Sequence, residues 1–150
     1  MKKLSVLSLA MAISLLLTVT SKAQEAKKPG AAHLKTKKCN DVVQEILESS
    51  TRFKQLTKNL FAAVKKNKGS GFGTMLDASP NPARDEANAQ SDKYELSLHE
   101  SYPDRTVNIA HFEFNPKTKL LYEVNEVDPD KPKPIAFNKK LLVEFSKACR

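Results

Sequence analysis

The fold is decided by residues 94–124, YELSLHESYPDRTVNIAHFEFNPKTKLLYEV. Apolar and polar residues alternate in three segments of this stretch, which is the pattern of strands that bury one face. Two short segments with a proline, YPDR at 102–105 and NPKTK at 115–119, separate the three. Proline favours the second position of a tight turn. The stretch therefore predicts three antiparallel strands joined by two hairpin turns.

The middle strand changes its alternation, and a β-bulge explains the change. Its apolar positions shift by one place before the second half, which contains Phe112 and Phe114. If Ala110 and His111 together oppose Ser97, both halves turn their apolar side chains to the same face. The bulge then predicts three apolar rows across the strands: Tyr94–Phe114–Leu120, Leu96–Phe112–Tyr122 and Leu98–Ile109–Val124.

Helices are predicted before and after these strands. Apolar residues recur every three or four places at 40–48 and 51–67, and a run of Ser and Thr separates the two segments. A last helix is predicted at 139–149, where Asn138 is a suitable N-cap.

The remaining segments predict short strands and loops. We expect a short strand at 71–77, a long polar loop at 78–91, a proline-rich connector at 128–134 and an edge strand at 135–137. The fold class is therefore α+β. It consists of an N-terminal helix or helix pair, an antiparallel meander sheet of three to five strands and a C-terminal helix.

In layout alone, a helix followed by a meander, the chain resembles cystatins and nuclear transport factor 2. Inhibitory cystatins carry a Gln-x-Val-x-Gly hairpin, and that motif is absent from this sequence. The resemblance therefore concerns the arrangement of elements and gives no basis for protease inhibition.

The N-terminus predicts an export signal. Lys2 and Lys3 precede an uncharged, leucine-rich stretch, and small residues occupy the −3 and −1 positions of a cleavage site after Ala23. A transmembrane anchor is the alternative, and the stretch is at its lower limit of length. We expect a signal peptide at 1–23, a disordered basic spacer at 24–38 and a single domain at 39–150. The mature chain is then expected to be exported, either periplasmic or extracellular, without stable membrane insertion.

Two cysteines in an exported chain predict one disulfide. Cys39 opens the first predicted helix and Cys149 ends the last one. Oxidising compartments favour pairing of an even number of cysteines. A catalytic or redox thiol is the alternative, but the sequence has no Cys-x-x-Cys motif.

The net charge of +8 belongs mainly to the N-terminal segments. Residues 1–23 have three lysines and no acidic residue, and residues 24–38 have five lysines and one glutamate. Residues 39–150 have 17 basic and 16 acidic residues, so the predicted domain is nearly neutral. This balance disfavours nucleic-acid binding by the domain. Weak contact of the basic spacer with anionic surfaces stays an expectation.

A pair of glutamates on the polar face of the predicted sheet is the candidate catalytic or metal site. The bulge places Glu95 opposite Glu113, with Glu123 and His111 nearby, and opposed like charges destabilise a sheet. A divalent cation would offset the repulsion, and carboxylates beside a histidine suit acid–base chemistry. The structural alternative is a solvated face on which Lys93 and other lysines balance the charge.

The first hairpin turn is the candidate binding site. Tyr102 and Arg105 are residue types enriched in binding hot spots, and Asp104 lies between them. The alternative is that Tyr102 packs over the end of the sheet while Arg105 pairs with Glu100 or Glu126.

These features predict an exported, non-catalytic binding module: an inhibitor, an immunity-type protein or an envelope accessory protein. No cofactor is expected, and the expected partner is an exported or envelope protein. The alternative function is a metal-dependent or acid–base hydrolase that uses Glu95, Glu113, Glu123 and His111. No G-x-S-x-G or His-Glu-x-x-His motif supports that alternative.

Overall fold

A six-stranded sheet with the order β2-β1-β3-β4-β5-β6 forms the centre of the computed structural model, which describes residues 37–124 and 132–149. The strands are β1 (Gly71–Ser79), β2 (Ala89–Gln90), β3 (Tyr94–Ser101), β4 (Thr106–Asn115), β5 (Leu120–Val124) and β6 (Lys133–Ile135). Only β1 and β2 run parallel; the other neighbouring strands are antiparallel.

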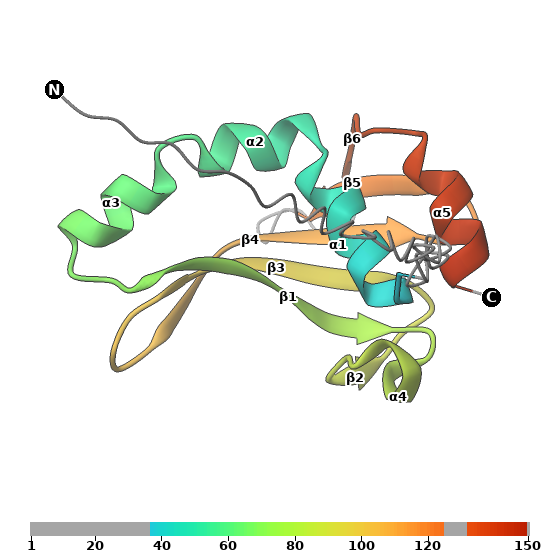
Figure 1. The fold of residues 1–150 in the computed structure, drawn as a ribbon, viewed down its shortest axis with the longest axis horizontal. Coiled ribbons are helices and arrows are strands. Elements are labelled where there is room, and N and C mark those ends of the chain that lie inside the picture. The colour runs from blue at the N-terminus through green and yellow to red at the C-terminus, as the bar shows by residue number, and fades with distance from the viewer. Residues whose placement is uncertain (1–36, 125–131, 150) are drawn as a thin grey trace, which may run out of the picture. The chain divides into compact units, whose positions relative to one another are not determined.

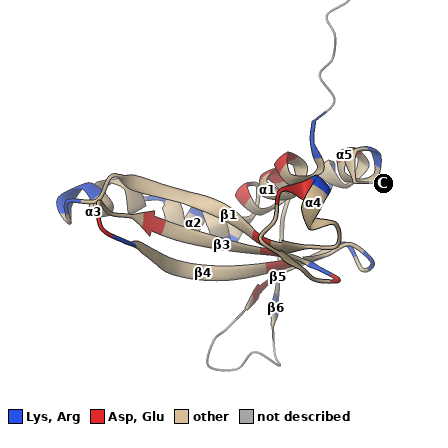
Figure 2. Ribbon diagram, turned by 90° about the horizontal axis from the view of Figure 1, so that it is seen from below, with Lys and Arg blue, Asp and Glu red and all other residues tan. Residues whose placement is uncertain are grey.

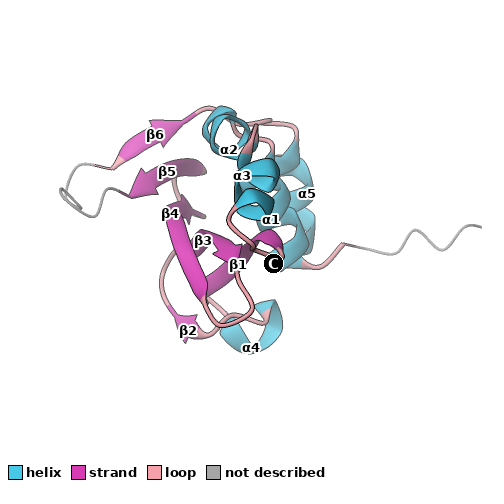
Figure 3. Cartoon of the chain, turned by 90° about the vertical axis from the view of Figure 1, so that its left-hand side faces the viewer, coloured by secondary structure: helices cyan, strands magenta, loops and turns pink. Residues whose placement is uncertain are grey.

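The described part of the chain has five helices, which are α1 (Cys39–Glu48), α2 (Thr51–Thr57), α3 (Leu60–Lys66), α4 (Pro82–Asp85) and α5 (Leu141–Ala148). Helices α1, α2, α3 and α5 lie on one face of the sheet (Figures 1 and 3). The short α4 lies apart from the other four, beside β2 at the sheet edge. This arrangement confirms the α+β class, and no helix among the described residues has the length and apolarity needed to cross a bilayer.

The core lies between α1, α5 and the sheet. The apolar stripe of α1 is buried, and so are the alternate residues of β3 and of the second half of β4. Helix α1 contributes Val42, Val43, Ile46 and Leu47, which meet Leu96, Leu98, Phe112, Phe114, Leu121 and Phe145. Residues three or four apart on a helix and two apart on a strand share a face, so these periodicities of the sequence build one core.

The disulfide predicted between Cys39 and Cys149 is confirmed. The two Cα atoms lie 4.8 Å apart, and the bridge spans 110 positions of the sequence. It joins the first residue of α1 to the residue after α5. The bridge therefore holds together the two helices that cover the middle of the core.

The expected single helix over 51–67 is divided. Ser50 caps α2, and its hydroxyl oxygen accepts a hydrogen bond from the Phe53 amide at 3.1 Å. Asn59 leaves the helical region with φ −125° and ψ 7°, so α3 begins separately at Leu60. The side chain of a serine at an N-cap satisfies an amide that the helix cannot.

The β-bulge exists but lies one place earlier in β4 than predicted. The predicted pairs Tyr94–Phe114, Glu95–Glu113 and Leu96–Phe112 are confirmed. The register then shifts between Leu98, which opposes Ala110, and His99, which opposes Asn108, so Ile109 is the extra residue. The predicted position at Ala110 and His111 is wrong because both Ile109 and Ala110 pack against the core, whereas the prediction gave that role to Ile109 alone.

The register predicted for β5 is wrong by one residue. Leu121, not Leu120, opposes Phe114, because Asn115 still pairs with Leu120 across a four-residue turn. The Asn115 side-chain oxygen accepts hydrogen bonds from two amides of the turn, and Lys119 adopts a left-handed conformation with φ 57°. A one-residue slip exchanges the faces of a strand. Leu121 is therefore buried, whereas Tyr122 moves to the opposite face.

The sheet has more strands than the three to five predicted because the polar loop at 78–91 is partly structured. It contains α4, started by Pro82, and β2, which pairs through Ala89 with Ala78 of β1. The edge strand expected at 135–137 is present as β6, two residues earlier. The predicted signal peptide, nearly all of the predicted spacer and most of the predicted connector at 128–134 fall outside the described residues.

Candidate functional site

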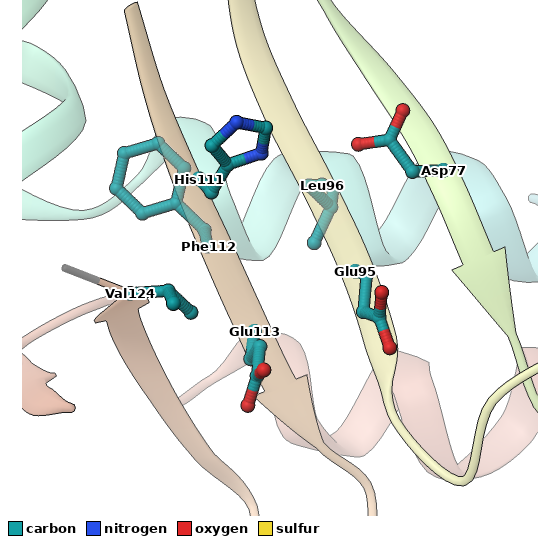
Figure 4. Close-up of a pocket in the computed structure, with 7 residues that line it drawn as sticks. All are labelled: Asp77, Glu95, Leu96, His111, Phe112, Glu113 and Val124. Carbon is teal, nitrogen blue, oxygen red and sulfur yellow. The ribbon is translucent and has the colours of Figure 1, made fainter. Parts of the chain in front are cut away.

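The open face of the sheet, opposite the four helices, has a pocket of about 310 Å³. Figure 4 shows its polar side chains: Asp77 on β1, Glu95 on β3, and His111 and Glu113 on β4. Glu95 and Glu113 occupy directly opposite positions, as predicted. Three carboxylates and an imidazole therefore line one shallow site, and part of its lining is apolar.

Lys93 offsets the repulsion between the paired glutamates. Its Nζ lies 2.6 Å from Glu113 Oε2. The hydrogen bond to Glu113 is the main cause of a raised pKa of Lys93, and the charge of Glu95 adds a smaller contribution in the same direction. The lysine keeps its charge beside the carboxylates and supplies the cation that this face requires. The contact between Lys93 and Glu113 is the one expected if this face is a solvated surface on which lysines balance the carboxylates.

Glu123 does not belong to this site. It opposes Phe112, so its side chain is on the helix-covered face of the sheet. There Arg52 Nε of α2 donates to both carboxylate oxygens of Glu123 at 2.9 Å. The predicted grouping of Glu123 with Glu95, Glu113 and His111 is wrong because of the one-residue slip in β5. Among the residues that the structure describes, no group of three or more His, Cys, Asp or Glu side chains could hold a metal ion.

Asp77 is a pocket residue that the sequence analysis missed. The register between β1 and β3 shifts between Leu76 and Ala78, so Asp77 is the extra residue of a second bulge. An extra residue interrupts the simple alternation of a strand and redirects its side chain. The expected end of this strand at residue 77 left Asp77 at a boundary, where no periodic signal placed it on a face.

A buried polar cluster lies beside the disulfide. The Asp85 carboxylate is buried, and its Oδ1 accepts a hydrogen bond of 3.0 Å from Arg84 Nε. Its Oδ2 has no hydrogen-bond partner among the described residues. The Tyr94 hydroxyl lies 3.2 Å from Cys39 Sγ. Burial is the main cause of the raised pKa of Tyr94, and the negative charge of Asp85 adds to it.

The first hairpin turn forms a cluster of contacting side chains at the end of β3 and β4. The Tyr102 hydroxyl donates a 2.6 Å hydrogen bond to Glu100 Oε2, which raises the pKa of Tyr102. The Arg105 guanidinium lies over the Tyr102 ring, 4.8 Å from its centroid. Arg105 also pairs with Asp104 at 3.1 Å. The Tyr102 amide donates to the Arg105 carbonyl at 2.8 Å and closes the turn.

The structure therefore brings all three predicted binding residues together. Glu100 accepts a hydrogen bond from Tyr102 instead of pairing with Arg105, and Glu126 lies outside the described residues. The side chains of Arg105 and Asp104 are 59% and 71% exposed, so the ordered turn is accessible to a partner.

Comparison with known proteins identifies no relative of this chain. No family model matches the chain, and no curated protein or solved structure matches it either.

Proposed function

We propose that the chain is an exported, non-catalytic binding module that recognises an exported or envelope protein through the turn between β3 and β4. The observation that supports this most directly is the ordered and exposed cluster of Tyr102, Asp104 and Arg105. An aromatic ring stacked with a guanidinium offers a large contact area, a charge and several hydrogen-bond donors. Both residue types are enriched where binding energy is concentrated.

The contacts within the turn reduce the cost of binding. Ordering flexible side chains at an interface lowers affinity. Here Tyr102 is held by Glu100 and by the guanidinium of Arg105, so its ring is positioned before a partner arrives. A partner with a carboxylate beside an apolar surface fits this cluster, because Arg105 retains donors beyond its contact with Asp104.

Export is part of the proposal and has its own support. The disulfide between Cys39 and Cys149 is compatible with an oxidising compartment. The charged start, the apolar stretch and the small residues before Gln24 follow the order of a secretory signal. Mass spectrometry of the protein from its native host should give an N-terminus at Gln24. An intact N-terminus at Met1 would contradict export by this signal.

The alternative, a hydrolase on the open face of the sheet, has weaker support. It requires the carboxylates of Glu95 and Glu113 to be available for a cation or a proton transfer. Lys93 already contacts Glu113, and Glu123 lies on the other face. Non-catalytic binding at the turn is therefore the function that the geometry supports better.

A photocrosslinking experiment in the native host tests the binding surface. A photoreactive residue replaces Thr106 in one strain and Asp92 in another. Both residues are exposed; Thr106 directly follows Arg105, and Asp92 lies just beyond the other end of β3. We expect one defined adduct from position 106 and none of the same mass from position 92. Adding Tyr102→Ala and Arg105→Ala should remove the adduct, and thermal unfolding verifies that the variant is folded. The same adducts from both positions, or none from 106, would contradict recognition by the turn.

A further inference from the structure

A helical arm with a positive surface extends along the sheet. We define the basic arm as α2, α3 and the residues that follow as far as Lys68. Between Glu48 and Asp77 the sequence has six basic residues and no acidic one. Figure 2 shows the resulting concentration of Lys and Arg at α3. The remainder of residues 39–150 has 11 basic and 16 acidic residues, so a nearly neutral domain has one strongly positive part.

The fold leaves most of this charge unpaired. Arg52 is the exception, since it pairs with Glu123 of β5. The other five basic side chains are exposed, and within residues 37–124 and 132–149 none of them forms an ion pair: Lys54, Lys58, Lys65, Lys66 and Lys68. Five ammonium groups on one short arm repel each other, and an anionic surface relieves that repulsion.

An apolar side chain lies among these lysines. Phe61 is 57% exposed, although other apolar residues of the arm pack against the core. Lys65 Nζ lies 5.5 Å from the centroid of the Phe61 ring. Lys65 follows Phe61 by four positions within α3, which is the spacing of residues on one helix face. Lys58 is the C-cap of α2 and lies in the turn just before α3. The arm therefore presents an aromatic ring flanked by lysines.

We propose that the basic arm docks on the surface of a bilayer that contains anionic lipids. In this arrangement Phe61 enters the boundary between headgroups and acyl chains, and the lysines contact the headgroup phosphates. A helix with lysines beside an exposed aromatic side chain has the composition of helices that lie in a membrane interface. The lysines and Phe61 are different residues from Tyr102, Asp104 and Arg105 of the turn, and the inference goes beyond the proposed function.

The residue types favour a lipid surface over a nucleic acid or an acidic protein. Lysine is a compact charge on a flexible stem, which suits headgroups that move laterally. Arginine is preferred where phosphates or base edges are bound in fixed, bidentate geometry, and the only arginine of the arm is committed to Glu123. A duplex bound by the lysines alone would leave Phe61 without a contact that explains its exposure.

Vesicle co-sedimentation tests the proposal with the chain that begins at Gln24, which retains every described residue. The vesicles contain either phosphatidylglycerol and phosphatidylcholine in equal amounts or phosphatidylcholine alone. We expect binding to the anionic vesicles only. Each lysine near a charged bilayer contributes about five-fold to binding, so Lys58→Gln with Lys65→Gln should lower the partition coefficient about 25-fold. Phe61→Ser should lower it about ten-fold.

Helix α5 provides a matched control. Lys140, Val143 and Lys147 repeat the spacing of Lys58, Phe61 and Lys65, and Val143 is 60% exposed. Lys140→Gln with Lys147→Gln removes the same charge, and Val143→Ser removes a similarly exposed apolar side chain. These changes should lower binding less than about five-fold. Thermal unfolding verifies that every variant is folded.

Three outcomes would overturn the proposal. The first is equal binding to both kinds of vesicle, and the second is an equal loss of binding in the α5 variants. The third is tighter binding to a DNA duplex or to an acidic protein such as a carboxylate-rich carrier than to the anionic vesicles. None of these outcomes changes the expected adduct at position 106, so the proposed function is tested independently.

Discussion

Replacement of two neighbouring leucines tests the register of β5. Leu121 is 1% exposed and belongs to the core, whereas Leu120 is 37% exposed. Truncation of a buried leucine to alanine removes its contacts and leaves a cavity, which costs about 2–5 kcal/mol. Truncation at a partly exposed position without such a cavity costs about 1 kcal/mol or less. Leu121→Ala should therefore lower the free energy of unfolding by at least about 1 kcal/mol more than Leu120→Ala.

Urea and thermal unfolding of the two variants provide the measurement. At about 4 °C for each kcal/mol in a domain of this size, Leu121→Ala should lower Tm by roughly 8–20 °C and Leu120→Ala by about 4 °C or less. The two variants have the same composition and differ only in the face of the strand. Equal losses, or a larger loss for Leu120→Ala, would refute the observed register. They would also return Glu123 to the open face and restore the predicted group of carboxylates.

Three further predictions concern the core and its closure. Replacement of both Cys39 and Cys149 by alanine should lower the free energy of unfolding by about 4.8 kcal/mol, which is the chain-entropy value for a 110-residue loop. A loss under about 1 kcal/mol in urea titrations would contradict this prediction. Gly69→Ala should lower the free energy of unfolding by about 1–3 kcal/mol, because the new Cβ would lie 2.3 Å from a methyl carbon of Val64. Gly71→Ala, whose Cβ would have no neighbouring atom within 4 Å, should have no such cost. Equal effects of the two changes would contradict the close approach at Gly69. Tyr94 has a pKa raised above its ordinary 10.0, so its contribution to stability is complete below pH 10 and is lost as the pH rises through the folded pKa. Tyr94→Phe should flatten the alkaline part of the stability curve in unfolding at pH 8–11, and an unchanged slope would contradict this assignment.

The elements with strong periodicity could be predicted from the sequence, and so could the disulfide. Alternation placed β3 and the second half of β4 on the correct faces, including the opposition of Glu95 and Glu113. Helix α1 followed from residues three and four apart, and both cysteines lie at helix ends that pack together. These features depend on local patterns that the tertiary structure reinforces.

The predictions that were wrong concern segments whose structure depends on the backbone conformation of a single residue. The one-residue shift in the register of β5 follows from the left-handed conformation of Lys119. Lysine adopts this conformation rarely, and no pattern in the sequence predicts it. Lys68 likewise adopts a left-handed conformation after α3, with φ 66°. Gly69 is required for another reason, since the methyl of Val64 occupies the space of a side chain. In such cases residue propensities predict that a turn occurs, but not which residue adopts the left-handed conformation.

Asp77 of the pocket and Asp85 of the buried cluster could not be predicted because both lie outside any period of the sequence. Asp77 is the extra residue of a bulge, and Asp85 lies in a short helix within an expected loop. The hairpin turn at 102–105 was predicted correctly because its residues are adjacent in the sequence, and the contacts among its side chains are local.

The charge of the domain shows why a sum over a folded segment can mislead. Residues 39–150 are almost neutral, yet screening by salt limits the interaction of exposed charges to about 10 Å. Carboxylates of the open face beyond that distance do not neutralise the lysines of the basic arm, so a ligand at the arm experiences the local charge. The fold then decides which local charges share a surface.

The Ser70 amide donates to the Ser101 carbonyl at 2.8 Å, which joins the segment after α3 to the turn that carries Tyr102 and Arg105. A membrane-bound arm would therefore hold the recognition turn close to the lipid surface, where an envelope partner would meet it.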